Sequence, residues 1–90
     1  MTIWKWTVVP TDEQKILVPR GAKFLCCQLQ FNMPTLWALV DPATEKVNRT
    51  VYTIGTGNYC ELPTNAQYLG TYQIQDGRLV FHVFIGEDEL

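Results

Sequence analysis

The segment Gly55-Thr56-Gly57-Asn58 is the first place in the sequence where residue types and spacing could do chemistry. Glycines let backbone N–H groups approach a ligand, and concave runs of such groups bind anions. The Thr56 hydroxyl and the Asn58 amide add side-chain donors. The alternative is that the glycines only permit a turn at the end of a strand. A lone Gly-x-Gly without a strand-loop-helix context does not indicate a dinucleotide site or a P-loop.

The residues after the glycines extend this candidate site. The glycine segment opens the longest irregular stretch, which includes Tyr59 and runs to about Asn65, and long loops in compact domains are often functional. An anionic ligand such as a nucleotide would also need cations and stacking surfaces. Arg49, Arg78 and the tyrosines could supply them, so we take Arg49 and Arg78 as further ligand-binding candidates.

His82 is the only histidine and could serve as a general base. It lies in the strand-like run Val80–Phe84, and the chain contains neither a serine nor a second histidine to form a relay. An Asp or Glu partner stays open. We expect a packed or half-exposed strand histidine and no catalytic residue, so the sequence favours a protein that is not an enzyme.

Three cysteines, Cys26, Cys27 and Cys60, have neither the number nor the spacing of a disulfide framework, which fits a reducing compartment. One histidine with these cysteines does not make a tetrahedral zinc site, so we expect no metal and no cofactor. Adjacent residues in a strand point to opposite faces, and we expect Cys26 and Cys27 to be buried thiols. We expect Cys60 to be an ordinary surface thiol.

Aromatic residues are numerous for 90 residues, and several strand-like segments are apolar on both faces. Such a small β domain can cover an exposed face or edge with another copy of itself. We therefore expect a homo-oligomer, with Trp4, Trp6 and Trp37 as candidate interface residues.

The charge pattern argues against nucleic-acid binding, and the hydropathy pattern argues against membrane association. Seven basic residues are scattered along a chain of net charge −2, so no stripe of cations is present to bind a nucleic-acid backbone. No apolar run approaches the roughly 18 residues of a membrane span, and no signal-peptide pattern opens the chain. We expect no nucleic-acid partner and no membrane association.

Prolines and glycines divide the chain into pieces of strand length: 2–8, 15–18, 24–31, 35–40, 47–54, 68–75 and 78–85. The segment 35–40 is apolar on both faces, which indicates a central strand. No window of helix length shows a helical period. The pattern predicts an all-β fold, a single small antiparallel β-sandwich or partly open barrel of about seven short strands. It spans residues 1–90, with a solvated acidic tail at 87–90.

Asp76-Gly77 lies between the last two predicted strands. Asp-Gly between two β-rich runs is the strongest short hairpin signal, because a type I′ turn needs positive φ at both positions. We expect residues 68–75 and 78–85 to pair as an antiparallel hairpin.

The chain also resembles a family of small tailed-phage and prophage proteins known only as a domain of unknown function. The resemblance spans nearly the whole chain and rests on the following segments in this order: Ile3-Trp4-Lys5, Asp12-Glu13-Gln14, Pro19 with Gly21-Ala22, Leu36–Asp41, Gly55-Thr56-Gly57, Gly70-Thr71-Tyr72 and Leu79–Phe84. It implies a phage gene product in the bacterial host cytoplasm. It implies no activity. Many relatives have histidine where this chain has Asn58, which puts histidine chemistry at the loop in doubt.

Three functions follow as hypotheses. The first is a non-enzymatic phage accessory protein that counters host defence by binding, either by sequestering a nucleotide-type signal molecule or by blocking a bacterial host protein. The alternative is a minor virion component, a head or tail accessory module. An enzyme acting on nucleotides ranks last, since no catalytic constellation is visible.

Overall fold

The structure, a computed structural model, describes residues 1–90 and contains seven strands and no helix. The strands are β1 (Thr2–Thr7), β2 (Glu13–Pro19), β3 (Lys23–Gln30), β4 (Met33–Val40), β5 (Lys46–Gly55), β6 (Gln67–Ile74) and β7 (Leu79–Ile85). Each predicted strand is present, most of them with shifted ends. No element of the structure is a helix that could span a membrane.

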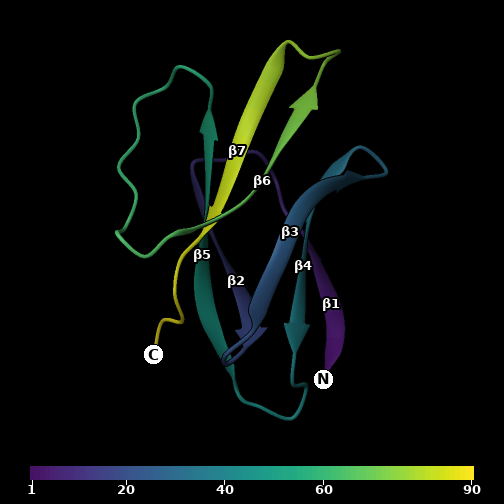
Figure 1. Cartoon of the computed structure of the whole chain (residues 1–90), viewed down its shortest axis with the longest axis vertical. Coiled ribbons are helices and arrows are strands. Elements are labelled where there is room, and N and C mark those ends of the chain that lie inside the picture. Colours follow the sequence, from purple (N-terminus) through teal and green to yellow (C-terminus); the bar gives the residue numbers. More distant parts are fainter.

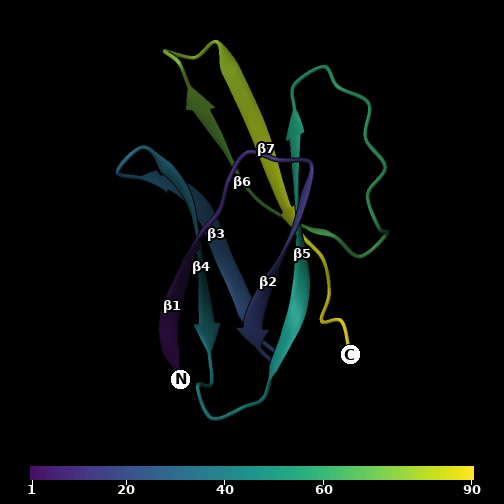
Figure 2. The same cartoon turned by 180° about the vertical axis from the view of Figure 1, so that it is seen from behind.

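The strands form two antiparallel sheets, one in the order β1-β4-β3 and the other in the order β2-β5-β7-β6. The two sheets do not close into a barrel. Of the two predicted alternatives, a sandwich or a partly open barrel, the structure is therefore the sandwich. Figures 1 and 2 show the β3–β4 and β6–β7 hairpins diverging at one end of the molecule. The long loop after β5 projects at the same end.

The core lies between the sheets and is built by alternation. In β4, Leu36, Ala38 and Val40 are fully buried and point toward the other sheet. There they meet Val51 and Val83, which are also fully buried. The prediction of β4 as a central strand is confirmed, because β1 and β3 pair with its two edges.

One side of the sandwich is joined where β3 of the first sheet approaches β6 of the second. A β-bulge interrupts each strand here, between Phe24 and Cys26 in β3 and between Tyr68 and Gly70 in β6. A Cβ atom on Gly70 would lie only 2.4 Å from the carbonyl oxygen of Cys27. Only glycine allows the two backbones to come so close.

The opposite side is joined by polar side chains between β1 and β2. The indole Nε1 of Trp6 donates a hydrogen bond to the Leu17 carbonyl oxygen at 3.0 Å. The amide of Gln14 donates to the Val9 carbonyl oxygen and accepts from the Val9 N–H. These bonds satisfy backbone groups at strand edges that would otherwise be open.

Two tight turns fix the hairpin registers. Asp76 and Gly77 both have positive φ, and Arg78 N–H donates to the Gln75 carbonyl oxygen, so the predicted hairpin between β6 and β7 is confirmed. The turn between β3 and β4 differs from the position implied by the predicted strands 24–31 and 35–40, which leave residues 32–34 for the turn. Its centre is Phe31-Asn32, both in the left-handed region, and Met33 already belongs to β4.

Candidate functional site

The glycine segment forms a β-turn at the end of β5. Asn58 N–H donates to the Gly55 carbonyl oxygen at 3.0 Å, and Gly57 has a φ of +90°. This is the turn that needs glycine at its third position. Thr56 N–H donates to the Val80 carbonyl oxygen. Because two of the four N–H groups are used within the protein, the segment is not an open anion-binding nest.

The turn brings the loop onto His82, which is half-buried on the outer face of β7. The Thr56 hydroxyl lies 2.6 Å from His82 Nε2, and the Thr71 hydroxyl lies 2.9 Å from His82 Nδ1. The Tyr68 hydroxyl lies 2.6 Å from Thr71 Oγ1. A continuous chain of hydrogen bonds therefore runs from the loop across β7 to β6.

Thr56 Oγ1 lies 3.5 Å from the Val80 carbonyl oxygen, which can only accept. In the tautomer protonated at Nε2, His82 donates to Thr56 Oγ1, whose own hydrogen is then free to point to that carbonyl. In the neutral imidazole, Nδ1 then accepts from the Thr71 hydroxyl, which accepts from Tyr68 in turn. Both ring nitrogens are occupied, so His82 could accept a substrate proton only after losing a threonine.

A groove of about 320 Å³ lies beside this chain, between the loop and the outer face of the sheet. This volume is at the lower end of the range for small-molecule sites. Tyr68 and Phe84 form an edge-to-face aromatic pair in it, with ring centroids 5.4 Å apart. We call it the His82 groove; it is lined by Ile54, Gly55, Thr56, Gly57, Asn58, Cys60, Leu62, Tyr68, His82 and Phe84.

A second, smaller groove of about 190 Å³ includes some of the same loop residues. Its charged residues are Asp12, Glu13 and Glu61, so we call it the acidic groove. Tyr59 also lines it and donates a hydrogen bond to Glu61 Oε1 at 2.6 Å. This bond raises the pKa of the Tyr59 hydroxyl, since it stabilises the protonated phenol. Carboxylates line the acidic groove and are absent from the His82 groove.

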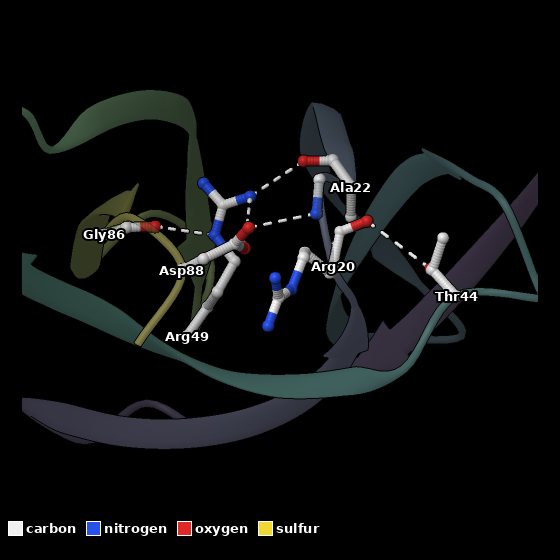
Figure 3. A network of polar contacts seen from close by, with 7 residues as sticks. Arg20, Ala22, Thr44, Arg49, Gly86 and Asp88 are labelled. Carbon is white, nitrogen blue, oxygen red and sulfur yellow. Dashed lines mark hydrogen bonds and ion pairs between the residues drawn. The ribbon is translucent and has the colours of Figure 1, made fainter. Parts of the chain in front are cut away.

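Arg49, a ligand-binding candidate from the sequence, lies elsewhere. Figure 3 shows its guanidinium among backbone groups, where Nε donates to the Gly86 carbonyl oxygen and NH1 to that of Ala22, both at 2.7 Å. Asp88 lies 3.8 Å away and accepts from Gly21 N–H. Burial lowers the pKa of Arg49, and the nearby acidic groups oppose that shift. The structure gives Arg49 a role in joining the C-terminal segment to the sheets.

Residues 87–90, which the sequence predicts as a solvated tail, are mostly exposed but are held in place by specific contacts. Glu89 N–H donates to the Asn48 carbonyl oxygen, and the Glu89 carboxylate pairs with Lys15 and accepts from Thr50. The segment is anchored against β5 and β2.

Arg78 remains available to a ligand. It directly precedes β7, its side chain is exposed, and it forms no ion pair. It lies four positions before His82, roughly 13 Å along an extended strand. Arg78 and the glycine turn thus flank the same stretch of β7. Arg49 lies away from this stretch, among Ala22, Gly86 and Asp88.

The three candidate interface tryptophans divide between the faces of the first sheet. Trp4 and Trp6 are half-buried and pack against the core, with Trp6 and Phe24 ring centroids 5.5 Å apart. Trp37 alternates with the buried residues of β4 and lies on the outer face. All three tryptophans are half-buried, and Trp37 is the one that does not pack against the core.

The cysteines are free, and Cys26 and Cys27 lie on opposite faces of β3 as expected. Cys27 is buried in the core, and burial raises the pKa of its thiol to about 11. Cys26 is half-buried on the outer face, which differs from the expected burial, and Cys60 is exposed in the loop. No three His, Cys, Asp or Glu side chains lie together in a way that could hold a metal ion.

The partners of His82 were missed by the sequence reasoning, although the hairpin contained the signal. Counting back from an Asp76-Gly77 turn places Thr71 opposite His82, which is the observed pairing. The contact with Thr56 had no comparable signal, because it depends on how the loop after β5 turns back.

The fold and the groove together define a small antiparallel β-sandwich with a loop-bordered site on the outer face of its four-stranded sheet. The chain belongs to the family described as a domain of unknown function (DUF7352), whose model matches residues 1–89. Searches of curated proteins and of solved structures gave no match.

Proposed function

We propose that this protein is a non-enzymatic binding protein that holds a nucleotide-type small molecule in the His82 groove. The observation that carries the proposal is the composition of this groove. It combines an aromatic pair, a hydrogen-bonded imidazole and hydroxyl groups, and no carboxylate lines it. Aromatic faces and positioned hydroxyls suit a planar heterocycle.

The distribution of charge supports the orientation of such a ligand. The acidic groove on the other part of the loop repels phosphate, while Arg78 offers an unpaired guanidinium near the start of β7. A base beside Tyr68 and Phe84 would direct the phosphate along β7 toward Arg78. The occupied nitrogens of His82 favour binding over proton transfer.

The biological setting is part of the same proposal. The resemblance to small phage proteins supports a phage accessory protein that acts in the bacterial host cytoplasm and counters host defence by sequestering a signal molecule. If no small molecule binds, the remaining version is one in which the protein blocks a host defence protein. The homo-oligomer stays a prediction, tested by the native mass of the purified protein.

The test is a titration of the isotope-labelled protein with mononucleotides, cyclic nucleotides and cyclic ADP-ribose isomers, followed by NMR. We expect shift changes at Tyr68, His82 and Phe84. Tyr68→Ala should weaken binding roughly tenfold, the size expected from losing one base–aromatic contact. Tyr59→Ala removes a tyrosine from the acidic groove and serves as the matched control, with no expected change.

Two results would contradict the proposal. The first is that no compound shifts these resonances, or that the changes centre on Asp12 and Glu61. The second is hydrolysis of a nucleotide that His82→Ala abolishes, since this would make the protein an enzyme.

A further inference from the structure

The outer face of the three-stranded sheet has a charge unlike the rest of the molecule. β1, β3 and β4 contain no Asp or Glu, although the whole chain has nine acidic residues and a net charge of −2. Lys5 and Lys23 are exposed on these strands and form no ion pair. Lys5 Nζ donates only to the neutral amide oxygen of Gln30. Two positive charges therefore stand uncompensated here.

Apolar side chains lie beside these lysines. The register pairs Lys5 with Trp37, and both Ile3 and Lys23 with Leu39. Ile3 is 57% exposed, and Trp37 and Leu39 are half-buried. Met33 continues the face toward the hairpin turn and is 42% exposed. These exposures show that no other segment of the chain covers the face.

The β3–β4 turn adds an exposed aromatic ring at the end of this face. Phe31 is 91% exposed and has a φ of +51°. Large L-residues seldom adopt this conformation, whereas the neighbouring Asn32 tolerates it. Phe31 therefore neither favours the turn conformation nor packs into the core. Unfavourable backbone conformations that persist without a structural benefit point to function.

We propose that this face, defined by Ile3, Lys5, Lys23, Met33, Trp37 and Phe31, docks a protein partner whose contact surface is apolar and carries carboxylates. Charge decides the class of partner. Two copies of the chain packed through this face would bring lysines together with no carboxylate between them. Two cations are too few for a nucleic-acid backbone. An exposed aromatic ring is the typical anchor of a protein interface.

The probe is a random displayed peptide library selected on the immobilised full-length protein. We expect the enriched peptides to be rich in Asp, Glu and large apolar residues. Lys5→Glu with Lys23→Glu should weaken them about tenfold at low ionic strength and less at high salt. Arg78→Glu reverses one charge on the other sheet and is the peptide-affinity control for Lys5→Glu or Lys23→Glu made singly.

Phe31→Asn separates binding from folding. Asparagine relieves the left-handed backbone, so we expect the Tm to rise while peptide affinity falls at least severalfold. Loss of binding in a more stable variant cannot come from unfolding.

The proposal is overturned if no peptide is enriched, if enriched peptides lack acidic residues, or if the lysine reversals leave their affinity unchanged. A native dimer that Phe31→Asn converts to a monomer would assign the face to a second copy and would also overturn it.

Discussion

At the scale of single residues, Arg49 shows how a cation can look functional in a sequence and be structural in the fold. Its guanidinium is buried and bonds two carbonyl oxygens from different parts of the chain. The sequence could not reveal this, because the bonds form only when Gly86 and Asp88 fold back beside β5. A buried cation with such partners is costly to remove.

We therefore expect Arg49→Met to lower the free energy of unfolding by about 3 kcal/mol, because the Ala22 and Gly86 carbonyls and the Asp88 carboxylate lose their partner. Denaturant unfolding measures the change. Arg78→Met, at an exposed site without an ion pair, should stay within about 0.5 kcal/mol of the parent. Equal losses in the two variants would show that Arg49 is not a structural residue.

Glu89 makes the folding stability of the protein depend on pH in the acidic range. The hydrogen bond from Lys15, then that from Thr50, lowers the pKa of the Glu89 carboxyl below its ordinary value of 4.5. A depressed pKa in the folded state stabilises the protein above about pH 4.5, and this contribution disappears as the pH falls through the lower folded value.

Thermal unfolding from neutral to acidic pH tests this dependence. Glu89→Gln should lower the Tm near neutral pH and make its fall below about pH 4.5 shallower than in the parent. The difference should shrink in high salt, since the pair with Lys15 is exposed and screened. Glu87→Gln is the control for removing one carboxylate from the same segment. A Glu89→Gln profile parallel to that of the parent would contradict the assigned role.

At the scale of elements, alternation and turn residues predicted most of the strands because both are local properties. Asp76-Gly77 predicted a hairpin whose geometry demands these residues, and 35–40 was recognised as central because both its faces are apolar. The turn at Phe31 was misplaced because phenylalanine carries no turn signal. The acidic segment was expected in solvent because its anchors, Lys15 and Asn48, are distant in sequence.

The seam where β3 approaches β6 depends on Gly70, so a side chain at this position should destabilise the contact between the two strands. Gly70→Ala would place a Cβ atom 2.4 Å from the Cys27 carbonyl oxygen. Backbone must move, so we expect a loss of about 2–3 kcal/mol in unfolding free energy. Gly86→Ala, where the nearest atom would lie at 3.5 Å, is the matched control and should cost much less. Similar losses would mean that the seam tolerates a side chain.

At the scale of the whole molecule, the two sheets present different chemistry. The four-stranded sheet carries the His82 groove and the acidic groove beneath one loop, while the three-stranded sheet carries a positive and apolar face. Sequence reasoning found the loop and Trp37 separately, since each stands out locally. It could not assign them to opposite sheets, because that depends on which strands pair. If both proposals hold, one small domain would bind a ligand on one sheet and contact a protein through the other.

Whether the His82 groove holds a small molecule can be measured by native mass spectrometry of the purified protein. We expect the protein to carry extra mass in the range of a nucleotide, either as purified or after incubation with the nucleotide panel. Tyr68→Ala should show a much smaller fraction of ligand-bound protein, in line with the roughly tenfold weaker binding, and Tyr59→Ala should match the parent. A protein that remains bare under all these conditions, or that binds equally well in both variants, would show that the His82 groove is not a nucleotide-binding site.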